Sequence, residues 1–253
     1  IEFLEHIFSG DLPSWSQMDD LTRRASSMLF WNLFVDGKNP ETANTWASID
    51  EAFISLRASN VFVNETTELL GVLRTKIRHV GMPLNLGGFI QPLLTHSTYT
   101  RYELLGALGY GRLPGSSVYE TGQFRSISGA REGVYYVPEA KVDLFLVTLQ
   151  KSDHLSPSTR YHDYAISDSI FHWESQSRTT PESPTGERYL NHRGLGSDVL
   201  LAVRQSAANA QGTMQFKLLG LADYIKHEGS KPIKIWWKLR ERMDPGTFEL
   251  AAA

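Results

Sequence analysis

The sequence predicts an α+β protein in which an N-terminal helical bundle, or connector, precedes a mostly-β region that forms a curved sheet or barrel. Two observations lead to this fold class. Apolar residues recur at helical spacing in residues 1–80, whereas from Glu132 onward short runs of β-branched and aromatic residues alternate with turn-forming clusters. A length of 253 residues allows two domains of ordinary size. We expect them at residues 1–92, the helical connector, and at residues 93–250, the β-rich domain.

Three helices are expected in the first domain. The first runs from Met18 to Val35, where apolar residues form one stripe and acidic residues occupy the first turn. The second starts at Ser48, which forms a capping box with Glu51, and the third starts at Asn64. No basic recognition helix is present, so we interpret this bundle as a spacer or docking platform in preference to a helix-turn-helix.

Turn-forming residues separate the helical part from the strands. Glycine and proline crowd residues 81–92, and Thr100 with Glu103 forms a second capping box that starts a short helix ending at Gly109. The expected strands are the runs GVYYVP, VDLFLVTLQ, SIFHWESQ, DVLLAVRQ, MQFKLLG and IKIWWKL. Few helices lie between them, which indicates an antiparallel sheet that is closed or strongly curved, because a flat sheet would leave exposed edges.

Composition excludes several classes of protein. No run of 18 apolar residues exists, so we expect no membrane partner, and the absence of cysteine excludes disulfides and thiolate metal sites, as fits a reducing cytoplasm. The net charge of −3 restricts any nucleic-acid site to a local patch. The motifs of P-loop ATPases, serine hydrolases, zinc proteases and dinucleotide enzymes are missing. We therefore expect a binding module that is not an enzyme and that uses neither a cofactor nor a metal.

Residues 149–192 are expected to carry the function. They hold four of the eight histidines and many aromatic and hydroxyl side chains, but little aliphatic surface. In the strand at residues 170–177, alternate side chains point to opposite faces, so one face is aromatic and the other forms hydrogen bonds. The aromatic face carries Phe171 and Trp173, and the other face carries His172, Glu174 and Gln176.

A pocket for an extruded nucleobase needs rings that stack on the base and polar groups that read its edge. The candidate base-binding residues are Tyr161, Asp163, Tyr164, Phe171, Trp173 and Gln176. Asp163 would accept a hydrogen bond from a cytosine amino group, and Tyr161, Tyr164 or Trp173 would stack. The alternative is that Phe171 and Trp173 are ordinary core residues and that Asp163 caps a turn.

Basic residues in and beside the loop at residues 177–193 are candidates for binding phosphate. They are Lys151, Arg160, Arg178, Arg188 and Arg193. Proline stiffens this loop, and the guanidinium fork suits phosphate or guanine; the alternative is a solvated hairpin loop. The histidines match no metal-binding or nuclease spacing, so we expect them to form hydrogen bonds or to face phosphates. They are His154, His162, His172 and His192.

Trp236 and Trp237 are adjacent in an expected strand. Adjacent residues point to opposite faces, so at most one of them belongs to the core. The other is exposed or covered by a second layer, such as the helical domain. We interpret the pair as packing residues.

Several stretches within residues 93–240 together resemble the uncharacterised domain at the C-terminus of bacterial superfamily II helicases. The stretches are Tyr99–Gly109, Arg131–Tyr135, Asp143–Ser152, Ser156–Asp168, Phe171–Ser177, Ser183–Tyr189 and Lys231–Ile233. Such helicases often carry an N-terminal phospholipase-D-type nuclease, as in modification-dependent (type IV) restriction enzymes. Their C-terminal region is similar in role to SRA-type readers, which extrude 5-methylcytosine or 5-hydroxymethylcytosine into a pocket of a PUA-like barrel.

The resemblance implies a DNA-recognition module of a bacterial, cytoplasmic restriction system, which reads modified cytosine by base flipping. Its partners would be modified double-stranded DNA and the helicase and nuclease domains of a parent chain, whose catalytic parts lie outside this sequence. No residue aligns with the pocket residues of an SRA domain, so the roles of Asp163, Tyr164 and Trp173 rest on their chemistry. Two alternatives stay open: a reader of phosphorothioate DNA or DNA ends, and a protein-interaction module that docks a helicase.

Overall fold

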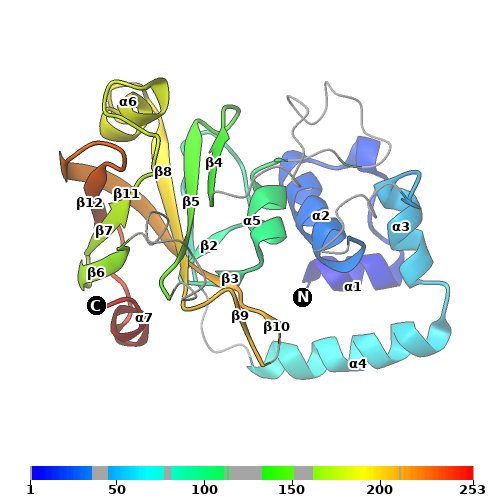
Figure 1. Cartoon of the computed structure of the whole chain (residues 1–253). Coiled ribbons are helices and arrows are strands. Elements are labelled where there is room, and N and C mark those ends of the chain that lie inside the picture. Colours follow the sequence, from blue (N-terminus) through cyan, green and yellow to red (C-terminus); the bar gives the residue numbers. More distant parts are fainter. Residues whose placement is uncertain are drawn as a thin grey trace. The chain divides into compact units, whose positions relative to one another are not determined.

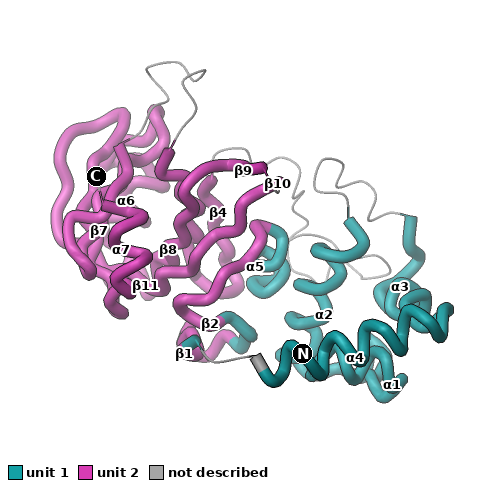
Figure 2. Tube along the Cα trace, turned by 90° about the horizontal axis from the view of Figure 1, so that it is seen from below, with its two compact units in different colours: residues 1–81, 90–93, 102–129 teal, residues 82–89, 94–101, 130–253 magenta. Residues whose placement is uncertain are grey.

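The computed structural model describes residues 2–35, 45–76, 81–110, 113, 133–150, 162–210 and 212–252. The chain forms two compact units, shown in different colours in Figure 2. The first consists of residues 1–81, 90–93 and 102–129, and the second of residues 82–89, 94–101 and 130–253. The chain therefore passes from one unit to the other several times between residues 81 and 130. The expected boundary at residue 92 separates two domains that would fold independently, and it stays a prediction.

The first unit is helical. Its elements are α1 (Glu2–Ser9), the 3-10 helix η1 (Trp15–Gln17), α2 (Asp20–Leu33), α3 (Ile49–Leu56) and α4 (Asn60–Lys76), and α5 (Arg101–Ala107) begins where the chain enters this unit again (Figure 1). The expected capping box starts α3, because Ser48 Oγ accepts a hydrogen bond from the N–H of Glu51 at 3.1 Å. Helix α4 begins at Asn60, earlier than the expected start at Asn64. No helix in the described ranges has the length and apolar character needed to cross a bilayer.

The second unit is built on one large sheet. In spatial order its strands are β4 (Val134–Val137), β5 (Val142–Thr148), β8 (Asp198–Arg204), β11 (Phe216–Glu228), β12 (Lys234–Leu239), β7 (Ile170–Glu174) and β6 (Tyr164–Ser167), and β3 (Thr98–Tyr99) also pairs with β11. Two small hairpins pair β1 (Met82–Pro83) with β2 (Leu94–Thr95), and β9 (Ala208–Asn209) with β10 (Gly212–Thr213). The α+β class with N-terminal helices is confirmed.

The structure excludes one alternative for the expected sheet and shows that one detail of it was wrong. The sheet is open, since β4 and β6 end the strand order, so the barrel that we considered is not formed. It is also mixed, because β8 runs parallel to β5, with Thr148 opposite Arg204. A parallel pair needs a long crossover, and residues 149–197, which include β6 and β7, provide it.

One face of the sheet, here called the inner face, carries the core of the second unit. Phe145, Trp173 and Trp237 are among its buried side chains. Helices α6 (Pro184–Leu190) and α7 (Pro245–Ala251) contribute Tyr189 and Ala251 to the same cluster, and Figure 1 shows them toward opposite ends of the sheet. The expected loop at residues 177–193 thus contains a helix. The opposite side of the sheet is called the outer face.

Candidate functional site

The two faces of β7 and β12 differ in chemistry. Side chains of alternate residues point to opposite faces of a strand, and Phe171 and Trp237 are fully buried on the inner face. The residues that point to the outer face are Ile170, His172, Glu174, Lys234, Trp236 and Lys238. The prediction that Trp236 and Trp237 belong to opposite faces is confirmed, with Trp236 half-buried on the outer face.

Three rings form a row across the outer face, here called the aromatic row: Tyr164 of β6, His172 of β7 and Trp236 of β12. They are neighbours by strand register, because His172 lies opposite both Tyr164 and Trp236. The rings of Tyr164 and His172 stack with their centroids 4.9 Å apart, and Trp236 meets His172 edge-on at 4.8 Å. Lys226 of β11 lies opposite Trp236, with its Nζ atom 4.2 Å from the centre of the indole ring.

Hydrogen bonds fix the polar groups beside this row. His172 is buried, and its Nδ1 donates a hydrogen bond to the carbonyl of His162 at 2.7 Å. Glu174 Oε2 accepts from the N–H of His162 at 3.2 Å, and the N–H of Glu174 donates to Asp163 Oδ1 at 2.9 Å. Of the sequence-predicted residues, Asp163 and Tyr164 are therefore brought together with two further groups, the His172 imidazole and the Glu174 carboxylate.

Exposed cations lie on the paired strands β11 and β12 and in two turns beside them, and we call them the cation set. They are Arg178, Lys226, Lys231, Lys234 and Lys238. The N–H of Lys231 donates to the carbonyl of Thr179 at 3.1 Å, which holds the turn with Arg178 beside the β11–β12 hairpin. Lys226 also pairs with Glu228 at 3.0 Å. These exposed cations belong to a chain whose net charge is −3.

Two predicted base-binding residues lie in the core instead. Phe171 is 0 % and Trp173 is 5 % exposed, and Trp173 stacks on Phe145 with ring centroids 4.1 Å apart. Tyr189 packs against the same indole edge-on at 5.5 Å, and Gln176 Nε2 donates to Tyr189 Oη at 3.3 Å. A ring enclosed in this way offers no free face to a base, which favours the alternative interpretation of Phe171 and Trp173 as core residues.

Arg188, a predicted phosphate-binding residue, is bound to a buried carboxylate. Its Nε donates to Asp143 Oδ2 at 2.6 Å and its Nη2 to Oδ1 at 2.9 Å, while the guanidinium lies 4.1 Å from the ring centre of Tyr136. Burial acts to lower the pKa of Arg188, but the hydrogen bonds and the charge of Asp143 outweigh it, so this pKa is raised. Arg188 binds Asp143 because of the local structure. Ser183 caps α6, and this helix directs Arg188 to Asp143 and not to solvent. The structure thus gives Arg188 a structural role.

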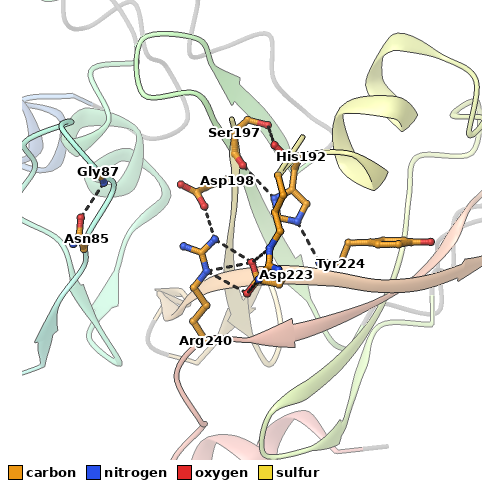
Figure 3. Close-up of polar contacts among 9 residues, drawn as sticks. Asn85, Gly87, His192, Ser197, Asp198, Asp223, Tyr224 and Arg240 are labelled. Atoms are coloured by element: carbon orange, nitrogen blue, oxygen red, sulfur yellow. Dashed lines mark hydrogen bonds and ion pairs between the residues drawn. The ribbon is translucent and has the colours of Figure 1, made fainter. Parts of the chain in front are cut away.

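Arg193 belongs to an ion-pair network, part of which is drawn in Figure 3. Arg193 Nη2 lies 2.6 Å from Asp223 Oδ2, and Arg240 Nη2 lies 3.0 Å from Asp223 Oδ1 and 2.7 Å from Asp198 Oδ1. Burial acts to raise the pKa of Asp223, but the hydrogen bonds and charges of the two arginines hold it below its ordinary value. Arg193 is therefore paired within the protein, whereas Arg178 forms no ion pair with any described residue.

His192 is buried beside this network with both ring nitrogens in use. Its Nδ1 donates to the carbonyl of Ser197 at 3.2 Å, and its Nε2 accepts from the N–H of Tyr224 at 3.2 Å (Figure 3). These two bonds fix the neutral tautomer, and burial is the main cause that lowers the pKa of His192. The structure thus supports the hydrogen-bonding role and not the phosphate-facing one.

Lys151, Arg160, Tyr161 and His154 lie outside the described residues. Among the residues that the structure does describe, no three His, Asp or Glu side chains are grouped so that they would hold a metal ion.

Sequence reasoning missed Trp236 and Lys226 as members of the site. Both lie far along the chain from residues 149–192 and reach His172 only through the pairing of β7, β12 and β11. A signal was present in the run KIWWK, since a strand with lysines and one tryptophan on the same side has a polar aromatic face.

One protein family matches the sequence. Its sequence profile covers residues 123–251, just over half of the 253 residues, and it is described as a domain of unknown function (DUF3427). The matched part includes the aromatic row and the cation set. No curated protein sequence matches the chain.

Proposed function

The chain belongs to the DUF3427 family, and we propose that it is the DNA-recognition module of a modification-dependent restriction helicase–nuclease. The module would bind double-stranded DNA that carries a modified cytosine and would catalyse no reaction itself. The description of the family assigns no function, so the proposal rests on the chemistry of the outer face and on the resemblance to restriction helicases.

The aromatic row is the observation that carries the proposal. Rings on a sheet face offer stacking surfaces to bases, and neighbouring cations attract phosphates. Trp236 combines both, because the ammonium of Lys226 lies 4.2 Å from its ring centre. Stacking of a base on an aromatic ring is worth about 1–3 kcal/mol, and an exposed cation–π contact about 0.5–1 kcal/mol. Replacement of the ammonium by a base is therefore favourable, and Lys226 would then exchange its exposed partner Glu228 for a phosphate.

The carboxylates beside the row suit the edge of a cytosine. A carboxylate accepts a hydrogen bond from the cytosine amino group, and a base extruded from the duplex exposes that group together with both of its faces. Asp163 and Glu174 lie beside His172 through the hydrogen bonds described above. In the proposed complex, Tyr164 and Trp236 stack on the base, Asp163 or Glu174 reads its edge, and the cation set binds the backbone.

A titration with three duplexes tests the proposal. The duplexes differ only in one base, which is cytosine, 5-methylcytosine or 5-hydroxymethylcytosine, and each is measured at two salt concentrations. Tighter binding of a modified duplex by tenfold, about 1.4 kcal/mol, is the expected result. Equal, salt-sensitive binding of all three would instead support backbone or end recognition, including the phosphorothioate alternative. No binding at low salt would reject a DNA-recognition function.

Lysine variants test the surface itself. Lys226→Gln and Lys234→Gln should weaken the binding of all three duplexes to a similar extent and reduce the salt dependence by roughly one unit of slope per lost phosphate contact. Lys141→Gln is the matched control, since Lys141 is an exposed lysine in the turn between β4 and β5, away from the aromatic row. Equal losses in all three variants would point to net charge and not to this surface.

Helix α4 favours a second function, the docking of a protein partner by the first unit. Five of its large apolar side chains are between 42 % and 71 % exposed, and their spacing places them along one side of the helix. They are Val61, Phe62, Leu69, Val72 and Leu73. A Leu69→Glu and Val72→Glu double variant should lose association with the helicase part of the parent protein and keep its DNA affinity. Unchanged association would reject this function.

A further inference from the structure

Arg204, the last residue of β8, is held by neutral groups. Its Nε donates to Thr148 Oγ1 at 3.0 Å, and its Nη1 donates to the carbonyls of Ala207 and Met214, both at 3.3 Å. The guanidinium carbon lies 4.3 Å from the ring centre of Phe216. Three hydrogen bonds and one ring therefore fix the orientation of this half-buried cation.

No carboxylate balances this charge within the described part of the chain. Arg204 forms no ion pair there, and its Nη2 donates no hydrogen bond to a described residue. Nη2 is also not among the fully buried unpaired polar atoms of these residues, and the Arg204 side chain is half-buried. Removal of a charge from water is costly, and half-buried cations are normally paired for that reason.

Arg101 adds a second positive charge at the same place. Phe216 of β11 lies opposite Tyr99 of β3, and Arg101 follows Tyr99 by two residues. Burial first, and the charge of Arg101 second, lower the pKa of Arg204. Arginine nevertheless stays charged at neutral pH, because its ordinary pKa exceeds about 12. The charge of Arg101 acts against the charge of Arg204, and an anion bound at Arg204 would offset this repulsion.

We propose that Arg204 and Arg101 form a binding site for a phosphate group. Nη2 of Arg204 would donate charge-assisted hydrogen bonds to the phosphate oxygens, while the hydrogen bond from Nε to Thr148 holds the guanidinium group in place. The site is distinct from the aromatic row: Phe216 and Lys226 are ten residues apart on β11, about 33 Å along an extended strand. The phosphate belongs either to a nucleic-acid backbone or to a free phosphate compound, which share this chemistry.

Titration with inorganic phosphate tests the site. Calorimetry and thermal unfolding are measured in phosphate and in chloride at the same ionic strength, because salt alone screens the two arginines. Phosphate should raise the unfolding midpoint of the wild type above that in chloride, and Arg204→Gln should lower the phosphate affinity at least tenfold. Arg242→Gln is the matched control, since the Arg242 side chain is 80 % exposed and lies 3.4 Å from Asp168. Equal phosphate affinity of wild type and Arg204→Gln would overturn the proposal.

Arg101→Gln keeps the proposal testable if Arg204→Gln does not fold. It removes none of the hydrogen bonds described for Arg204. We expect a phosphate affinity several-fold below that of the wild type and, because the repulsion is relieved, a smaller gain in the unfolding midpoint from phosphate. An unchanged phosphate affinity would overturn the proposal.

A parallel titration with DNA identifies the source of the phosphate. If the site binds a DNA backbone, Arg204→Gln weakens the binding of modified and unmodified duplexes equally. If it binds a free phosphate compound, the variant loses inorganic phosphate and keeps its DNA affinity. The inference does not depend on the proposed function: phosphate binding at Arg204 in a protein that binds no DNA would reject only the DNA-recognition function.

Discussion

Trp236 and His172 meet across β12 and β7 with ring centroids 4.8 Å apart and ring planes at 75°. The next residue, Trp237, points to the inner face and is fully buried. A single strand therefore contributes to the core on one side and to the aromatic row on the other. Inner-face substitutions should change stability without changing binding, and outer-face substitutions should do the reverse.

The ion pair of Arg188 with Asp143 should be needed for stability and not for binding. Arg188→Met leaves the fully buried carboxylate of Asp143 without its partner, and such a loss costs about 3–5 kcal/mol. Urea unfolding measures this loss in free energy of unfolding. The double variant Arg188→Met and Asp143→Leu should regain most of it, because no unpaired charge remains. A loss below about 1 kcal/mol in the single variant would show that the pair is not buried as described.

Trp173→Phe distinguishes a core residue from a base-binding residue. The smaller ring keeps an aromatic contact with Phe145 but leaves a gap, so we expect a loss of roughly 1–3 kcal/mol in the free energy of unfolding and unchanged DNA affinity. Affinity is compared at a temperature where the variant is fully folded. A tenfold loss of affinity in the folded variant would show that the indole contacts a base after all.

His192 should make the second unit less stable in mild acid. Its pKa is lowered in the folded protein, mainly by burial, so the unfolded chain binds the proton more readily. The stabilisation is fully present above the ordinary histidine pKa of about 6.5 and is lost as the pH falls through the lower folded value. Unfolding measured from pH 7.5 downward should therefore show a steeper decline in the wild type than in His192→Gln.

The environment of His192 allows a matched control for this effect. The hydrogen bond to Ser197 and the charges of Asp223 and Asp198 favour protonation of its ring, but burial, with the charge of Arg193 acting in the same direction, outweighs them. His6 is exposed in α1, so His6→Gln is the matched control for the loss of one histidine. If His6→Gln and His192→Gln had the same effect, the decline would not come from the buried histidine.

Periodicity within one element could be read from the sequence, whereas contacts between distant elements could not. The Ser48 capping box predicted the start of α3, and strict alternation predicted that Trp236 and Trp237 point to opposite faces. Helix α6 was missed because its seven residues are too short to show helical periodicity and lie among prolines. The parallel pairing of β8 with β5 depends on residues far apart in the chain, which no local pattern specifies.

The same limit applies to the candidate site. Asp163, Tyr164 and His172 are close in sequence, and their grouping was predictable. Arg188 was indistinguishable from a free arginine, because its partner Asp143 lies 45 residues away. Trp236 reaches the row only after β12 pairs with β7.

Asp244 should stabilise α7 through its N-cap. Its Oδ1 accepts from the N–H of Thr247 at 2.9 Å and its Oδ2 from the Thr247 hydroxyl at 2.6 Å, and the hydroxyl bond is the main cause that lowers its pKa to about 2. Asp244→Ala should cost about 0.5–2 kcal/mol, and Asp244→Asn much less. The stabilisation from the ionised cap is present above the unfolded value of about 3.9 and is lost as the pH falls toward the folded one. If the free energy of unfolding fell equally in the wild type and in Asp244→Asn between pH 5 and pH 2.5, the ionised cap would not contribute this stability.

The most direct test of the outer face is the affinity of Trp236→Ala for a duplex with a modified cytosine, measured by fluorescence anisotropy. Trp15→Ala is the matched control, since Trp15 is also half-buried beside a cation, Arg23, at 5.8 Å from its ring centre, but lies in the helical unit. We expect Trp236→Ala to lose about 5- to 150-fold in affinity, the equivalent of about 1–3 kcal/mol of stacking, and Trp15→Ala to bind as the wild type does. Equal affinities of the wild type and both folded variants would contradict a DNA-binding role for the aromatic row.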